Sequence, residues 1–198
     1  MSGAPNNSSR RKFLTAATAV VGGAGCACAL VPFVASWKPS KKAENAAAPV
    51  VVDLTQILPD QLFRVEWQGK PVWIIKRSPA VLAALPLHEN KLRDPASNEP
   101  QQPNFAKNPF RSIRPDIFVA VGICTHLGCS PMHLPNQFEQ RVEGVADGFF
   151  CPCHGSKFDM AGRVFKNVPA PLNLMIPPYY FIDNNTLLIG ELAPNEAV

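Results

Sequence analysis

The sequence predicts a mostly β protein: an N-terminal transmembrane helix followed by a small antiparallel β domain. The 198 residues include 21 prolines and 12 glycines, a composition that favours loops and short strands over a helical bundle. Short apolar segments of alternating or β-branched residues are separated by Gly, Pro and Asn turns. One long stretch near the N-terminus carries no charge. With 46 % hydrophobic residues, the chain can also bury a sizeable core.

The first segment, residues 1–12, is predicted to be a cytoplasmic N-terminus. Ser9–Leu14 (S-R-R-K-F-L) matches the twin-arginine export signal S-R-R-x-F-L. Residues 13–37 carry no charge, and a helix of that length spans about 37 Å, more than the roughly 30 Å of a bilayer's hydrocarbon core. We therefore expect an uncleaved single-pass anchor in the inner (cell) membrane, with the following residues on the periplasmic side. A cleaved signal segment is the alternative.

Residues 38–48 are polar and then small, which predicts a hinge linker between the anchor and a domain of residues 49–198. Fully extended, such a linker reaches about 36–40 Å. A flexible linker would let the domain swing, whereas a short helix over residues 46–48 is the alternative.

Within the domain, we expect a hairpin with strands at residues 62–67 and 72–76. Ser78 and the proline after it predict the start of a short helix over residues 80–85. The polar, proline-broken residues 89–115 predict a long surface excursion. The other strands are expected at 49–54, 117–123, 158–160, 173–176, 180–182 and 186–189.

Two short clusters carry the chemistry: C-T-H-L-G-C at Cys124–Cys129 and C-P-C-H-G-S at Cys151–Ser156. Each offers one Cys and one His at ligand spacing, plus one spare Cys. Two thiolates and two imidazoles match a [2Fe–2S] cluster with sulfur ligands on one iron and nitrogen ligands on the other. The spare cysteines fit a disulfide in an oxidising compartment. A tetrahedral zinc site is the rival interpretation, although its ligand pairs are usually spaced differently. Cys26 and Cys28 are expected to be small apolar residues of the anchor.

The two clusters resemble the signature boxes of Rieske iron–sulfur proteins. Val168–Leu174 (V-P-A-P-L-N-L) resembles the proline loop that covers the cluster in the Rieske subunit of the cytochrome bc complex, ubiquinol–cytochrome c oxidoreductase. The resemblance implies one Rieske-type [2Fe–2S] cluster per subunit, one iron on two thiolates and the other on two imidazoles. It also implies a disulfide between the spare cysteines and a hydrogen bond from the serine of the second box to a bridging sulfide. The implied ligands are Cys124, Cys151, His126 and His154; the implied disulfide is Cys129–Cys153; the serine is Ser156.

The same resemblance implies a role in electron transport. The domain would take one electron from ubiquinol and pass it to a c-type cytochrome, as a subunit of a proton-translocating quinol–cytochrome c reductase in the respiratory chain. Cytochrome b and a c-type cytochrome would be its partners within a dimeric complex. His154, or alternatively His126, would accept the hydrogen bond and proton of the quinol. The net charge of +4, without a basic and aromatic stripe, gives no argument for nucleic-acid binding.

Three other functions compete with this one. A Rieske small subunit of an exported molybdenum oxidase is the first alternative, and the V-P-A-P loop and the long anchor argue against it. Soluble Rieske ferredoxins and oxygenase domains lack the second cysteine of each box and the anchor. A membrane-anchored protein with purely structural disulfides would leave two histidines unexplained.

Five residues are notable for other reasons. Phe158 stands where higher-potential members of the family have Tyr, so the sequence predicts a lower midpoint potential here, because a hydrogen-bond donor to the Cys124 thiolate is missing. The proline loop starts with Asn167-Val168 where many relatives have Gly. His88 and His133 show no partner pattern and are expected to be surface or loop histidines.

Overall fold

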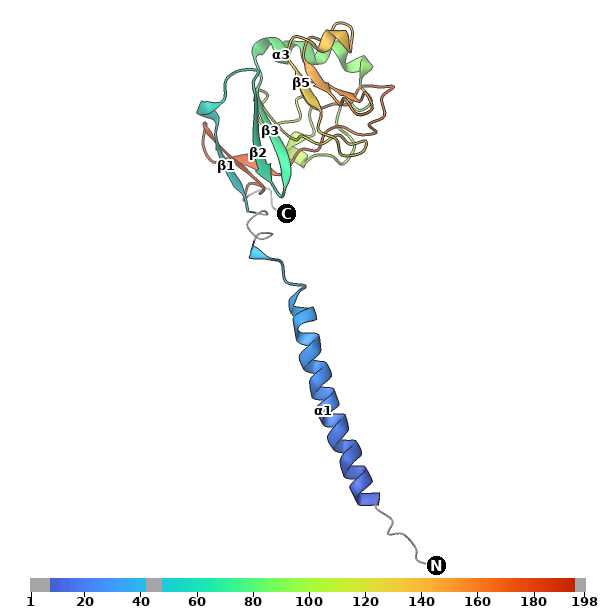
Figure 1. The fold of residues 1–198 in the computed structure, drawn as a ribbon. Coiled ribbons are helices and arrows are strands. Elements are labelled where there is room, and N and C mark those ends of the chain that lie inside the picture. Colours follow the sequence, from blue (N-terminus) through green and yellow to red (C-terminus); the bar gives the residue numbers. More distant parts are fainter. Residues whose placement is uncertain (1–7, 42–47, 195–198) are drawn as a thin grey trace, which may run out of the picture. The chain divides into compact units, whose positions relative to one another are not determined.

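The computed structural model describes residues 8–41 and 48–194, and the chain divides into two compact units, residues 1–45 and 46–198 (Figure 1). Part of the predicted linker, residues 42–47, lies outside the described residues.

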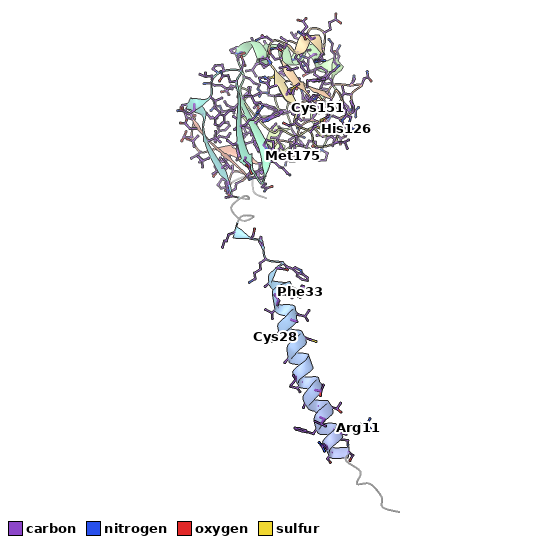
Figure 2. The ribbon with its side chains drawn as sticks, viewed as in Figure 1. Arg11, Cys28, Phe33, His126, Cys151 and Met175 are labelled. Atoms are coloured by element: carbon purple, nitrogen blue, oxygen red, sulfur yellow. A yellow bond between two sulfur atoms is a disulfide. The ribbon has the colours of Figure 1, made fainter. Side chains whose placement is uncertain are left out.

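Most of the described part of the N-terminal unit is a helix, α1, which runs from Ser8 to Ala35 and buries none of its residues. Its apolar side chains are exposed, including Phe33, and so is Cys28 (Figure 2). By length and composition α1 can cross a membrane. It begins five residues before the predicted span because Arg and Lys are good helix formers and Ser is favoured at the start of a helix. It ends just before the Lys38-Pro39 pair, whose proline disfavours helical backbone in the residue before it.

In residues 48–194, the second unit contains three antiparallel sheets of three strands each. The first has the order β1 (Val50–Asp53), β9 (Thr186–Ile189), β8 (Tyr179–Phe181). The second is β2 (Leu62–Trp67), β3 (Lys70–Lys76), β4 (Ile117–Val121), and the third is β5 (Met132–Leu134), β6 (Gly148–Phe150), β7 (Lys157–Phe158). The connecting helices are η1 (Leu54–Gln56), α3 (Pro79–Ala84), η2 (Leu85–Lys91), η3 (Asn104–Ala106) and η4 (Phe138–Gln140).

The second sheet forms the centre of the core. Its predicted hairpin is present, and Gln68 and Gly69 at the turn both have positive φ, as two-residue hairpin turns require. Residues 72–75 of β3 and all of β4 are buried. Gly122, directly after β4, touches the indole of Trp73 so closely that a Cβ there would overlap it. The strand that leads to the first cysteine box is therefore fixed against β3, by its pairing and by this close contact.

The helix predicted after the hairpin is also present. α3 starts at Pro79, and the Ser78 hydroxyl accepts a hydrogen bond from the Val81 N–H, so Ser78 is the N-cap. The turn between β8 and β9 is closed by the Asp183 carboxylate, which accepts from the Asn185 N–H.

Two predictions about the domain were wrong, and most of one sheet was not predicted. Residues 173–176 do not form a strand, because their backbone bonds three separate segments: Leu174 N–H bonds Gly162, Ile176 N–H bonds Gln101, and Met175 C=O accepts from Val121. Residues 89–115 are only partly a surface excursion, since η3 and several fully buried residues lie within them. The third sheet was missed except for β7, because β5 and β6 have only three residues each.

Candidate metal centre

Two loops with the same backbone design carry the predicted ligands. The first loop, Cys124–Cys129, follows β4, and the second, Cys151–Ser156, joins β6 to β7. In the first loop the Cys124 N–H bonds the Cys129 carbonyl (2.7 Å), and the Gly128 N–H bonds the Cys124 carbonyl (3.0 Å). In the second loop the corresponding bonds are Cys151 N–H to Ser156 (2.8 Å) and Gly155 N–H to Cys151 (2.9 Å). Each loop thus returns on itself within six residues.

The glycines of these loops have a conformational role. Gly128 has φ of 83° and Gly155 has φ of 78°, in the left-handed region where a side chain is disfavoured. Each glycine lies four residues after the first cysteine of its box, and this places its N–H beneath that cysteine's carbonyl. The glycine of each box is therefore needed for the turn that closes its loop.

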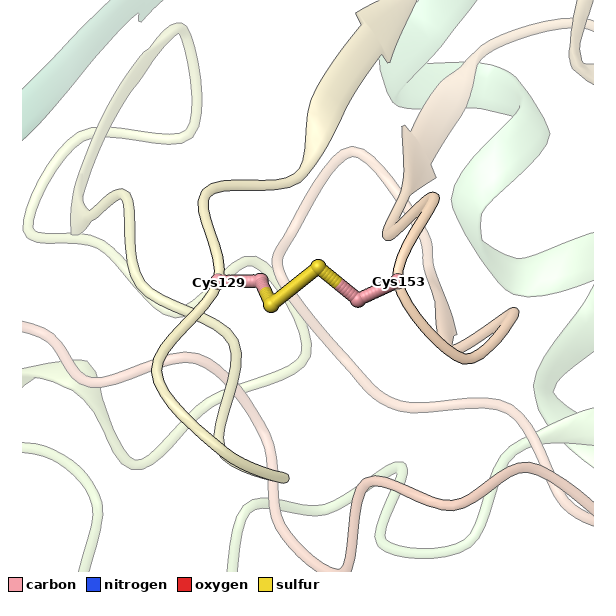
Figure 3. The surroundings of a disulfide bond; sticks show 2 residues. All are labelled: Cys129 and Cys153. Carbon is pink, nitrogen blue, oxygen red and sulfur yellow. A yellow bond between two sulfur atoms is a disulfide. The ribbon is translucent and has the colours of Figure 1, made fainter.

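A disulfide between Cys129 and Cys153 joins the two loops, with their Cα atoms 6.7 Å apart (Figure 3). The Cys151 sulfur lies within 4.8 Å of the sulfurs of both. Because Cys129 and Cys153 are bonded to each other, they do not offer thiolates to a metal ion. Of the cysteines in the second unit, this leaves Cys124 and Cys151 free.

The two free thiols face each other inside the protein. Cys124 is 2 % exposed and Cys151 is 1 % exposed, and the Cys151 thiol is close enough to influence the ionisation of Cys124. Burial raises the pKa of the Cys124 thiol; the neighbouring Cys151 thiol raises it further, against the lowering effect of hydrogen bonds from the His126 backbone and the Ser156 hydroxyl. A buried thiol whose ionisation is disfavoured, beside a second free buried thiol, forms a site that a bound cation completes.

The two histidines lie together beside the thiols. The ring centroids of His126 and His154 are 4.7 Å apart and the ring planes are nearly perpendicular, at 89°. His154 is exposed, whereas His126 is half-buried. Nδ1 of His126 is buried and has no hydrogen-bond partner. Cys151 and His126 lie in the same part of the domain (Figure 2).

The donor set fits a Rieske-type [2Fe–2S] cluster. An unpartnered buried imidazole nitrogen costs free energy unless something binds it, and metal coordination is the usual use of such an atom. The described residues supply two free buried thiols and two apposed imidazoles, which is the ligand count that one sulfur-bound and one nitrogen-bound iron require.

The proline loop forms a third wall of the site. The Ala170 N–H donates to the Ser156 hydroxyl oxygen (3.0 Å), so this serine links the second loop to the proline loop. The Thr125 hydroxyl donates to the Leu172 carbonyl (2.7 Å) and links the first loop to it. The sequence analysis did not single out Thr125. The only signal for its role was a hydroxyl side chain between Cys124 and His126 in the first box.

A buried network of charges lies in the segment that follows the second loop and β7. Asp159 and Arg163 are fully buried, and the Arg163 Nε lies 2.7 Å from the Asp159 carboxylate. His88 Nε2 lies 3.3 Å from the same carboxylate. Burial alone would raise the pKa of Asp159, but the Arg163 guanidinium and His88 lower it below its ordinary value. His88 is therefore a buried partner of a carboxylate and not a surface histidine; His133 is only half-buried, and its Nε2 is shielded from solvent.

Known proteins resemble the whole chain. Residues 1–40 match the family model described as "Ubiquitinol-cytochrome C reductase Fe-S subunit TAT signal", and residues 48–178 match "Rieske [2Fe-2S] domain". The ubiquinol-cytochrome c reductase iron-sulfur subunit of Allochromatium vinosum is 56 % identical over 187 residues, covering 93 % of this chain and 90 % of the relative. The subunit of the same name from Bradyrhizobium diazoefficiens is 39 % identical, covering 91 % of this chain and 94 % of the relative.

A solved structure titled "Hyperthermophilic respiratory Complex III" matches with a TM-score of 0.48 and 27 % identity, covering 89 % of this chain and 98 % of that chain. The family rests on the sequence matches, which extend over both the anchor and the domain with the two boxes. The chain belongs to the family of ubiquinol–cytochrome c reductase iron–sulfur subunits, with a Rieske domain over residues 48–178.

Proposed function

We propose that this chain is the one-electron carrier of a membrane ubiquinol–cytochrome c reductase. The observation that carries the proposal is the meeting of two free buried thiols and two imidazoles on loops joined by a disulfide. The curated relatives bear the name of that enzyme over more than nine-tenths of this chain, which supports this function over the small subunit of a molybdenum oxidase.

Cys124 and Cys151 would hold one iron and His126 and His154 the other. The bound cluster supplies a one-electron acceptor of high potential for its class, because neutral imidazoles replace two thiolates. The buried thiols exclude water from the sulfur side. Since Nδ1 of His126 is the buried, unpartnered nitrogen, the proton of that ring belongs on Nε2.

His154 is the proposed contact with the quinol hydroxyl. Its side chain is exposed, while His126 is half-buried, so His154 is the more accessible acceptor of a hydrogen bond and a proton. Ser156, Thr125 and the proline loop keep the two loops in register through the hydrogen bonds described above. The histidine therefore needs little rearrangement when substrate arrives.

The topology of the whole chain supports the rest of the proposal. α1 is the single-pass anchor in the cell membrane, residues 38–48 are the hinge and residues 49–198 the cluster domain. The match of residues 1–40 to a twin-arginine signal model supports export of the domain to the periplasmic side. Cytochrome b and a c-type cytochrome, in a dimeric complex, are the proposed partners, which agrees with the reductase named in the relatives' descriptions.

The test uses the full chain in its membrane. We expect iron and acid-labile sulfide at two atoms each per chain, and a reduced EPR spectrum with the low average g value of mixed nitrogen and sulfur ligation. Cys124→Ser should abolish the spectrum and the oxidation of ubiquinol by cytochrome c. Cys26→Ser, in the exposed face of α1, should leave both unchanged. Zinc in place of iron, or an all-thiolate spectrum, would contradict the proposal.

A further inference from the structure

A groove on the cluster domain carries positive charge from four separate segments. It has a volume of about 270 Å³ and lies apart from the proposed cluster ligands, none of which line it. We call it the basic groove, and its lining residues are Lys91, Arg141, Val142, Lys157, Phe165, Lys166 and Asn167.

The lining contains four cations and no carboxylate. Within residues 8–41 and 48–194, no acidic group forms an ion pair with Lys91, Arg141, Lys157 or Lys166. Like charges that converge on one concavity repel each other, and this repulsion is relieved when an anion binds among them. The groove thus differs from an ordinary charged surface, where both signs alternate.

The cations are positioned but retain hydrogen-bond capacity. The Lys91 ammonium donates to the Glu143 carbonyl (2.6 Å), and the Lys166 ammonium donates to the Asn90 carbonyl (2.9 Å). An ammonium has three donors, so each of these two keeps two for a ligand. Arg141 lies over the ring of Phe150 at 4.3 Å, and this stacking orients its guanidinium plane.

The floor of the groove is rigid. Phe165 is buried at 3 % exposure, and its N–H bonds the Lys157 carbonyl (3.1 Å). The Lys166 N–H bonds the Lys91 carbonyl (2.9 Å), which ties the first and last of these segments together. A site that exists before its ligand arrives loses little conformational entropy on binding.

We propose that the basic groove binds a phosphate-type oxyanion, either free phosphate or the phosphate of a lipid headgroup. The guanidinium and the three ammonium groups of the lining suit the tetrahedral oxygens of a phosphate group, which accepts several charge-assisted hydrogen bonds at once. The small volume favours one compact anion. The bound anion links η2, the segment directly after η4, β7 and the turn at residues 166–167, and so stabilises the fold around the second cysteine box.

The test measures binding and stability, not electron transfer. Inorganic phosphate is titrated by calorimetry into the full chain with its cluster, in a neutral detergent, against chloride at equal ionic strength. Wild type should bind phosphate and unfold at a higher temperature with phosphate than with chloride. Arg141→Gln combined with Lys157→Gln should weaken phosphate binding about tenfold or more, since each cation contributes charge-assisted hydrogen bonds. Lys107→Gln, an exposed lysine outside the groove, is the matched control.

A second arm identifies the source of the phosphate. Mixed micelles with phosphatidylglycerol are compared with micelles of phosphatidylcholine. Saturation by inorganic phosphate supports a free anion; stabilisation by phosphatidylglycerol alone supports a lipid headgroup. The absence of both responses overturns the proposal, as does an equal loss of binding in Lys107→Gln. The EPR spectrum of each variant shows that the cluster domain is folded, so a failure here is distinct from a failure of the proposed electron-carrier function.

Discussion

Replacement of Arg163 by Met is expected to destabilise the cluster domain strongly. In the structure the guanidinium is fully buried and donates to the Asp159 carboxylate at 2.7 Å and to the Leu85 carbonyl at 2.8 Å. Met has a similar length but no charge, so the Asp159 carboxylate stays buried with His88 as its remaining side-chain ion-pair partner. Breaking a buried ion pair in this way costs about 3–5 kcal/mol. For a domain of this size the unfolding temperature should fall by roughly 6–20 °C.

The effect of pH has a definite sign. The pKa of Asp159 is lowered in the wild type, so its ion pair stabilises the fold above the ordinary carboxyl pKa and is lost as the pH falls through the lowered value. Without Arg163, burial would raise the pKa of Asp159. The deficit of the variant should therefore be largest near pH 7 and shrink toward pH 4, where the carboxyl becomes protonated.

The assay is thermal unfolding of the full chain in detergent, monitored by tryptophan fluorescence near pH 7 and near pH 4. Asp159→Asn added to Arg163→Met provides the control. An Asn oxygen can still accept the N–H groups of Ala161 and residue 163, which now bond the carboxylate at 2.9 and 2.8 Å. The double variant should recover a large part of the loss at neutral pH. A single variant within about 1 kcal/mol of wild type, or a double variant less stable than the single one, would refute the reasoning.

Three further predictions concern the loops and the core. Removal of the disulfide by Cys129→Ala with Cys153→Ala should lower the free energy of unfolding by about 3.5 kcal/mol, because the bond closes a loop with a sequence separation of 24. Urea unfolding measures this loss, and an unchanged midpoint would contradict the prediction. Phe158→Tyr should raise the midpoint potential by about 40 mV, equal to about 1 kcal/mol for one electron, and protein-film voltammetry without a rise would contradict this. Gly122→Ala should cost about 1–3 kcal/mol because the new methyl group overlaps the Trp73 indole, and an unchanged thermal midpoint would show that the indole moves freely.

The features predicted well from the sequence are those that local residues determine. The hairpin follows from the alternation of its strands and from a turn with two positive φ values. The helix after it follows from the Ser78 cap and from Pro79. The two boxes contain their own closing hydrogen bonds, so their sequence spacing already encodes the geometry of each loop.

The features that were missed depend on residues far apart in the chain. The pairing of His88 with Asp159 spans 71 positions, and neither residue carries a local sign of the other. Arg111 was assigned to a surface excursion, yet its guanidinium is buried and bonds the carbonyls of Ala161, Gly162 and Leu174. Those carbonyls belong to irregular segments. No periodic pattern in the sequence therefore predicts that an arginine will donate hydrogen bonds to them.

The pairing of the first strand with the last has a consequence for biosynthesis. Val50 in β1 pairs with Ile189 in β9, so the first sheet cannot close until the ribosome has released almost the whole chain. Strand pairs so distant in sequence also form late, because the entropy of closing the intervening loop is lost before any contact compensates. The first sheet of a nascent chain therefore stays open until β9 has been synthesised, after the residues of the other two sheets.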